Sequence, residues 1–315
     1  MSNRVFAVTG LAIAIAFAAA SQLVTNEYFF TAAYTVLQFV ILATAWNILG
    51  GYTGYVNFGS AAFFAIGAYS SVFLYNAFKA PLPVMIVVGT LAAGLAGLGL
   101  GYLTLRLRGV FFAIASLALA VVLHTFVVNW DYVGGARGAY VLQPREVPFG
   151  LPRYIHVLYV AMVLMAAVSL IVARVIEHST FGRGLAAIRD DELAAECSGV
   201  PTLRLKIFST MMSCALMGMA GTTFPYYLSY IEPSSAFSLS YAVNSIAMPL
   251  IGGMMSWLGP LIGAILLGTV QQLVQVTISS AWNLLIVGAL LVIFVTLAPN
   301  GIMGWVDAWR RRKGR

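Results

Sequence analysis

Charged residues are scarce in this sequence, and their scarcity excludes an ordinary water-soluble domain. Asp, Glu, Lys and Arg make up 9% of the 315 residues, whereas hydrophobic residues make up 61%. A soluble globular domain carries roughly a quarter charged residues. The mean hydropathy of +0.92 points the same way. The sequence therefore predicts a protein that crosses a membrane many times.

The motifs that carry chemistry are also missing from the sequence. The lysines are Lys79, Lys206 and Lys313, and none stands in the Gly-Lys-Ser/Thr context of a phosphate-binding loop. No metal-ligand spacing and no nucleophile elbow occur. We expect no enzyme activity, no cofactor and no metal. If transport is driven by ATP, the hydrolysis must take place on another subunit.

The sequence has few cysteines, and its excess of basic over acidic residues can be explained without a nucleic-acid partner. Cys197 and Cys214 are the two cysteines, and their placement predicts no disulfide. The net charge is +7. Basic residues of a membrane protein mark its cytoplasmic loops, so we expect no nucleic-acid partner.

Apolar runs of about 20 residues without two-residue alternation predict helices, because lipid offers the backbone no hydrogen bonds. The fold class is an all-α polytopic membrane protein forming one domain over residues 1–315, with about ten transmembrane or re-entrant helices. These are predicted at 5–24, 30–49, 56–78, 84–103, 110–128, 155–173, 207–228, 241–255, 258–276 and 282–298. Gly259-Pro260 is expected to break the chain between the eighth and ninth. The first run also resembles a signal peptide, but it is long enough to cross, so we favour a retained span.

The distribution of Lys and Arg predicts the orientation. Basic residues gather around Arg4, at Arg106 and Arg108, in residues 174–206 and in the tail 305–315. Placing all four in the cytoplasm puts both termini inside. The loop 129–154 and the loop around 231–237 then face outward, although the former carries three arginines, Arg137, Arg145 and Arg153.

Half of the acidic residues lie in one polar stretch, residues 174–206, interleaved with bases. Ser179 or Thr180 can begin a helix there, and Asp190 can cap the start of another. Gly199 and Pro201 are typical of a helix end. The stretch is predicted to form one or two short capped helices. An amphipathic helix on the lipid surface is the alternative, but acids match bases here, which favours docking of a protein partner.

Glycines interrupt one apolar run at 50, 51, 54, 59 and 67. Irregular backbone at membrane depth must be buried in protein or line a cavity. The interruption therefore predicts either a substrate path or close helix packing. The path candidates are polar and aromatic residues of this run and of a later span: Asn57, Ser60, Phe63, Phe64 and Asn244.

Several stretches together carry a family resemblance. GRGLAAIRDDELAAECSGV, within the polar stretch, resembles the coupling-helix motif of ABC importer permeases of the branched-chain amino acid family, LivM type. NILGGYTGYVNFGSAAFFAIGAY, LRLRGVFFAIASLALAVVL, NWDYVGG and PLIGGMMSWLGPLIGA resemble other blocks of this family in the same order. Two residues depart from the pattern: Ser60 stands where the family often has His, and Met255 where it has Gly.

The resemblance implies a permease domain of an importer similar to ABC type II permeases, in the bacterial inner membrane. It implies four partners besides lipid: two cytoplasmic ATP-binding subunits, a second LivH-like permease and a periplasmic substrate-binding protein. The residues expected to couple to the ATPases are Arg183, Ile188, Arg189, Asp190, Asp191, Glu192, Glu196 and Gly199. The expected cargo is a branched-chain or related small amino acid. Alternatives are urea, short amides or aromatic acids as cargo, or a stand-alone secondary carrier or channel.

Overall fold

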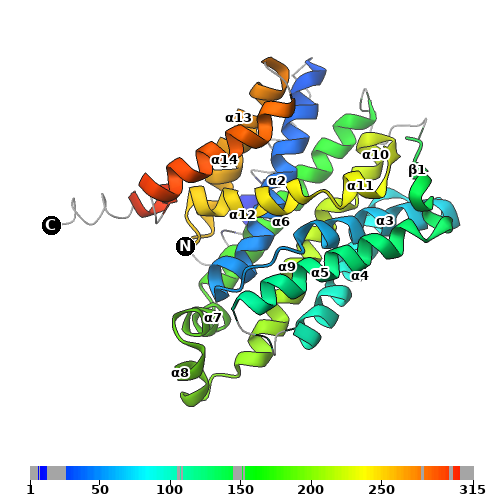
Figure 1. Cartoon of the computed structure of the whole chain (residues 1–315). Coiled ribbons are helices and arrows are strands. Elements are labelled where there is room, and N and C mark those ends of the chain that lie inside the picture. The colour runs from blue at the N-terminus through cyan, green and yellow to red at the C-terminus, as the bar shows by residue number, and fades with distance from the viewer. Residues whose placement is uncertain are drawn as a thin grey trace.

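Long helices cross one another in a bundle, and two short helices project from one end of it (Figure 1). The computed structural model describes residues 6, 8–12, 26–104, 107, 109–144, 151, 153–277, 280–297 and 301–305. The long helices are α2 (Glu27–Thr53), α3 (Ser60–Phe78), α4 (Leu82–Thr104), α5 (Val110–Val128), α6 (Tyr154–Glu177), α9 (Thr202–Gly221), α12 (Leu239–Gly252), α13 (Leu258–Thr277) and α14 (Ser280–Leu297).

Within the described residues, seven helical segments are long and apolar enough to cross a membrane. They cover 27–53, 60–78, 82–103, 110–128, 154–177, 202–228 and 258–276. This result confirms the all-α polytopic prediction. The predicted first span 5–24 lies mostly outside the described residues. Arg4, Arg106, Arg108, Arg145 and tail residues 306–315 lie outside them entirely.

The break between α12 and α13 lies earlier than predicted. α12 ends at Gly252, and Gly253 has a φ of 115°, a conformation that favours glycine. Gly259 and Pro260 already belong to the first turn of α13. Proline is tolerated there because the first helical N–H groups have no partner within the helix. The prediction that Gly259-Pro260 breaks the chain was therefore wrong, and residues 253–257 form the break.

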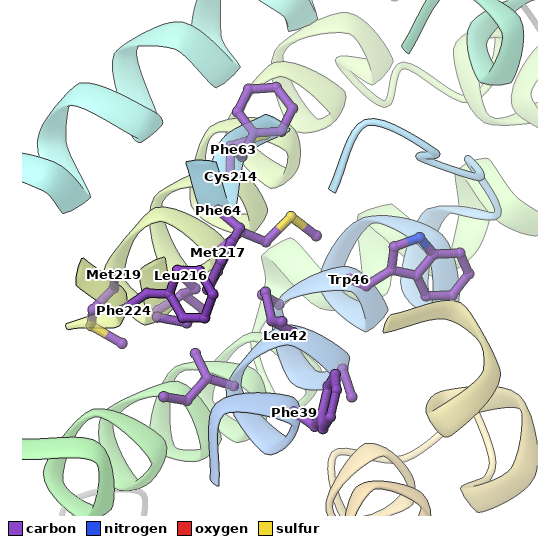
Figure 2. Packing of buried hydrophobic residues seen from close by; sticks show 14 of the residues in the cluster. Phe39, Leu42, Trp46, Phe63, Phe64, Cys214, Leu216, Met217, Met219 and Phe224 are labelled. Carbon is purple, nitrogen blue, oxygen red and sulfur yellow. The ribbon is translucent and has the colours of Figure 1, made fainter. Parts of the chain in front are cut away.

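Small residues bring the helices together. Lipid is as apolar as a leucine side chain, so helices in a membrane associate through close packing rather than through the hydrophobic effect. An added Cβ at Gly97 of α4 would lie 2.4 Å from the Cβ of Cys214 in α9. α9 thus packs closely against α4, and it also contacts α2, α3 and α6. Figure 2 shows buried side chains of α9 and of its neighbours, among them Leu42, Phe64 and Met217.

The remaining short elements lie at the two ends of the bundle. α7 (Thr180–Asp190) and α8 (Glu192–Cys197) project at one end, and β1 (Ala139–Tyr140) lies at the other (Figure 1). β1 pairs with β2 (Tyr230–Ile231) in an antiparallel sheet, with Ala139 opposite Ile231. The single-turn helices η2 (Asp131–Val133) and η3 (Gly135–Arg137), and the short α10 (Phe224–Leu228) and α11 (Pro233–Ala236), flank these strands. The sheet joins the two loops that the sequence places on the same side of the membrane.

Candidate functional site

The coupling segment, residues 174–206, contains two separately capped helices. Ser179 Oγ accepts a hydrogen bond from the Gly182 N–H at 3.1 Å, as predicted for the start of α7. Asp191, not Asp190, caps α8: its Oδ1 accepts from Leu193 N–H at 2.9 Å and from Ala194 N–H at 3.0 Å. The predicted cap was off by one residue because consecutive aspartates offer the same chemistry. Asp190 instead ends α7.

The end of α8 follows the sequence prediction. Gly199 has a φ of 82°, in the left-handed region that stops a helix. The Val200 N–H donates to the carbonyl oxygen of Ala195 at 3.0 Å, and Pro201 follows. The coupling segment is therefore a folded element rather than a loose loop.

The eight residues expected to couple to the ATPases all lie in this segment, but they point in two directions. Ile188 is buried with 3% of its surface exposed, and Glu192 and Arg189 are half-buried. The exposed ones are Arg183, Asp190, Asp191, Glu196 and Gly199. The exposed side chains can touch a partner, whereas the buried and half-buried ones hold the segment to the membrane domain.

Apolar surface lies among the exposed charges. Leu193 of α8 is 60% exposed, and Ala194 and Cys197 beside it are exposed too. A large apolar side chain exposed among charges at the end of the bundle suits contact with another protein. Sequence reasoning placed Leu193 on a short helix but did not single it out as a site residue.

A buried ion pair fastens α8 to α9. Lys206 Nζ lies 2.6 Å from Glu192 Oε1, and the side chains are 3% and 14% exposed. The Tyr55 hydroxyl donates to Glu192 Oε2 at 2.5 Å. Lys206 Nζ also lies 5.0 Å from the centre of the Tyr55 ring. Each charge is thus compensated at close range, which a buried ion requires.

The Glu177 carboxylate connects the end of α6 to α2 and to the break before α13. Glu177, the last residue of α6, accepts from the Tyr52 hydroxyl at 3.3 Å. It also accepts from the Trp257 N–H at 2.6 Å, in the break before α13. The same break meets α7, where Arg189 donates to Met255 Sδ at 2.8 Å. Met255 thereby contacts the coupling segment.

The predicted path residues all lie inside the protein, in or near the broken segment, residues 54–59. Asn57, Ser60, Phe63 and Phe64 are fully buried, and Asn244 is 8% exposed. Asn57 Oδ1 accepts from the Gly59 N–H at 2.8 Å, which shapes the turn into α3. Phe64 stacks on Tyr241 of α12 at 4.5 Å.

The polar members of this group bond to other protein groups. Ser245 Oγ donates to Ser60 Oγ at 3.1 Å, and Gln271 Nε2 donates to Asn244 Oδ1 at 2.8 Å. Both bonds tie α12 to its neighbours. An open cavity of about 260 Å³ lies close by, against α5 and α11. Its lining includes Phe58 and Ala61, the sequence neighbours of Asn57 and Ser60, together with His124.

Many apolar spans in a helical bundle, with a folded charged segment at one end, define a multi-pass membrane protein. A family model described as the permease component of the branched-chain amino acid transport system matches residues 28–295, and the chain belongs to this family. It is therefore a multi-pass membrane protein and the permease component of an ABC transporter, not the catalytic component.

Curated relatives agree with this assignment. The high-affinity branched-chain amino acid transport permease LivM of Escherichia coli (strain K12) is 26% identical over 84% of this chain and 67% of its own length. A probable branched-chain amino acid permease LivH of Methanocaldococcus jannaschii is 26% identical, over 87% of this chain and 90% of its own. The ribose import permease RbsC of Haemophilus influenzae is 25% identical over 70% of this chain and 68% of its own. No solved structure matches the chain significantly.

Proposed function

We propose that this chain is a permease subunit of an ATP-driven importer for branched-chain or related small amino acids. It receives substrate from a periplasmic binding protein and releases it into the cytoplasm across the bacterial inner membrane. The family match over residues 28–295 and the LivM and LivH relatives support this cargo class.

The exposed end of the coupling segment is the observation that carries the proposal. A chain without a nucleotide-binding loop needs a rigid surface on which ATPase subunits push. α7 and α8 offer one, with exposed Leu193 between the charged residues Arg183 and Glu196. Two ATPases contact this surface and the matching surface of a second, LivH-like permease. Their closure shifts a bistable bundle between outward and inward openings.

This arrangement places the α7–α8 end, and both termini, in the cytoplasm. The opposite end, with β1, β2 and the exposed Arg153–Glu27 ion pair, then faces the periplasm and meets the binding protein. Arg137 and Arg153 lie on the periplasmic side in this topology, although basic residues are usually enriched in cytoplasmic loops. Arg153 is balanced by Glu27, with N and O atoms 2.5 Å apart.

Uptake in cells tests the cargo. A strain deleted for this gene is complemented with the wild-type chain, and leucine uptake is measured with competitors present. We expect isoleucine and valine to compete, and urea, phenylacetate and ribose to have no effect. The ribose relative makes a sugar the second candidate. Uptake of ribose that depends on this chain, with no uptake of leucine, would replace an amino acid by a sugar as cargo.

Docking of the ATPases on α8 is tested by changing its exposed apolar residue, Leu193. Leu193→Arg should abolish co-purification of the ATPases, because a charge would then enter an apolar contact. Leu142→Arg is the matched control: Leu142 is 68% exposed, just after β1 at the opposite end of the bundle. Undiminished co-purification with Leu193→Arg would contradict docking on α8.

A further inference from the structure

The coupling segment contacts the broken segment, residues 54–59, and Tyr52, which lies two positions before it. Tyr52 bonds to Glu177 at 3.3 Å. Gly54 lies against Arg189, since an added Cβ would come within 3.2 Å of its Cγ. Tyr55 bonds to Glu192 at 2.5 Å. Two regions that the sequence presents as separate sites are therefore in direct contact.

One of these contacts is buried and charged. The side chains of Lys206 and Glu192 are 3% and 14% exposed. Lys206 pairs with Glu192 Oε1, and the Tyr55 hydroxyl donates to the other carboxylate oxygen, Oε2. Separating α8 from α9 would leave the buried charges of Glu192 and Lys206 without each other, and an unpaired buried charge is strongly unfavourable. α8, the start of α9 and Tyr55 must therefore move together.

The broken segment in turn bonds to two spans and is linked to α12. Trp46 Nε1 of α2 donates to the Asn57 carbonyl oxygen at 2.9 Å. The Phe58 N–H donates to Ser116 Oγ of α5 at 3.0 Å. Asn57 also accepts from Ser60 Oγ, and Ser60 bonds to Ser245 of α12. A displacement of residues 54–59 would reach α2 and α5 directly and α12 through Ser60.

The backbone of this segment suits a moving part. Residues 54–59 are not helical, so a change of φ and ψ within them disturbs helical hydrogen bonds only at the two ends, where the Gly54 N–H donates to Gly50 and the Gly59 carbonyl oxygen accepts from Ala62. Gly54 has a φ of 78°, and hinges lie at such element ends. Phe58 and Ala61, at the end of the segment and the start of α3, line the open cavity of about 260 Å³ against α5.

We propose that Tyr55, Glu192 and Lys206 form a clasp through which movement of α8 shifts the broken segment and thereby reshapes the cavity beside α5. The inference rests on the proposed function for the source of the movement, the ATPases. The clasp residues act by positioning and touch no substrate. Physical contact alone does not establish coupling, so the test measures the coupling itself.

The test uses the full complex in proteoliposomes: this chain, the second permease, both ATPases and the binding protein. ATP hydrolysis and leucine uptake are measured on the same vesicles. Tyr55→Phe removes only the hydroxyl. We expect ATPase co-purification and hydrolysis within twofold of wild type, and uptake per ATP reduced at least fivefold. Tyr34→Phe is the matched control, since its buried hydroxyl shares a hydrogen bond of 2.8 Å with Thr223 Oγ1, away from the clasp.

A double variant tests the Glu192–Lys206 ion pair of the clasp. Glu192→Gln with Lys206→Met leaves no lone buried ion, and we expect the same loss of uptake per ATP. Unchanged uptake per ATP in both variants would overturn the clasp. A parallel fall of hydrolysis and uptake would also overturn it, because that marks a general structural role. Failure of the wild-type complex to bind ATPases would instead contradict the proposed function.

Discussion

At the residue scale, Asp191 holds the first turn of α8 through one carboxylate oxygen that accepts from two backbone N–H groups. Asp191→Ala should cost about 1 kcal/mol of local stability, the usual effect of losing such a cap. We expect about fivefold faster hydrogen exchange at the amides of Leu193 and Ala194. Asp190→Ala is the control, since Asp190 contributes no cap, and equal exchange in the two variants would contradict this assignment.

Gly54 occupies a conformation that other residues adopt at a cost. Its φ is 78°, and Arg189 lies against its backbone. Gly54→Ala should therefore lose roughly 1–2 kcal/mol. In detergent, the melting temperature should fall by a few degrees.

Gly99→Ala in α4 is the matched control for Gly54. No atom lies within 4 Å of a Cβ added at Gly99, so the substitution should be neutral or stabilising. A melting temperature of Gly54→Ala as high as that of Gly99→Ala would show that the turn at Gly54 tolerates a side chain.

At the element scale, sequence reasoning succeeded where a local pattern decides the structure. α5 begins and ends at the predicted residues, because an apolar run lies between Gly109 and Asn129. α3 begins at Ser60 rather than at the predicted Val56, because residues 54–59 form the turn that Asn57 shapes. At α3, and at the break near Gly259-Pro260, the predicted helix exists and only the residue at which it begins or ends differs from the prediction.

Contacts between distant residues could not be predicted. Tyr55 and Glu192 are 137 positions apart, and no pattern around either one names the other. The same holds for Glu177 and Trp257, 80 positions apart. The resemblance located the coupling segment and the broken segment separately, and the packing of α8 against α9 brings them together.

The orientation of the ends can be tested with the two native cysteines. Cys197 of α8 is exposed and Cys214 is buried. In cells that lack the ATPases, a membrane-impermeant maleimide should label Cys197 in inside-out vesicles and leave intact spheroplasts unlabelled. In a Cys197→Ser background, Tyr140→Cys should show the reverse, because Tyr140 is 71% exposed at the opposite end. Labelling of Cys197 in spheroplasts would invert the proposed topology.

At the scale of the whole molecule, the chain is the permease component of an ABC transporter. The spans supply the crossing, and the buried Glu192–Lys206 pair fastens the coupling segment, which is the surface proposed for the ATPases, to α9. A secondary carrier would need an energy source of its own, and proton-coupled carriers keep ionisable relays at membrane depth. Here Lys206 lies in the first turns of α9, beside α8.

The most direct test of the account is ATP-dependent uptake by the reconstituted importer. Proteoliposomes carry this chain with the second permease and both ATPases, with ATP inside and the binding protein and leucine outside. The account predicts leucine accumulation that requires ATP, the binding protein and every subunit. Accumulation by this chain alone, insensitive to ATP, would contradict it.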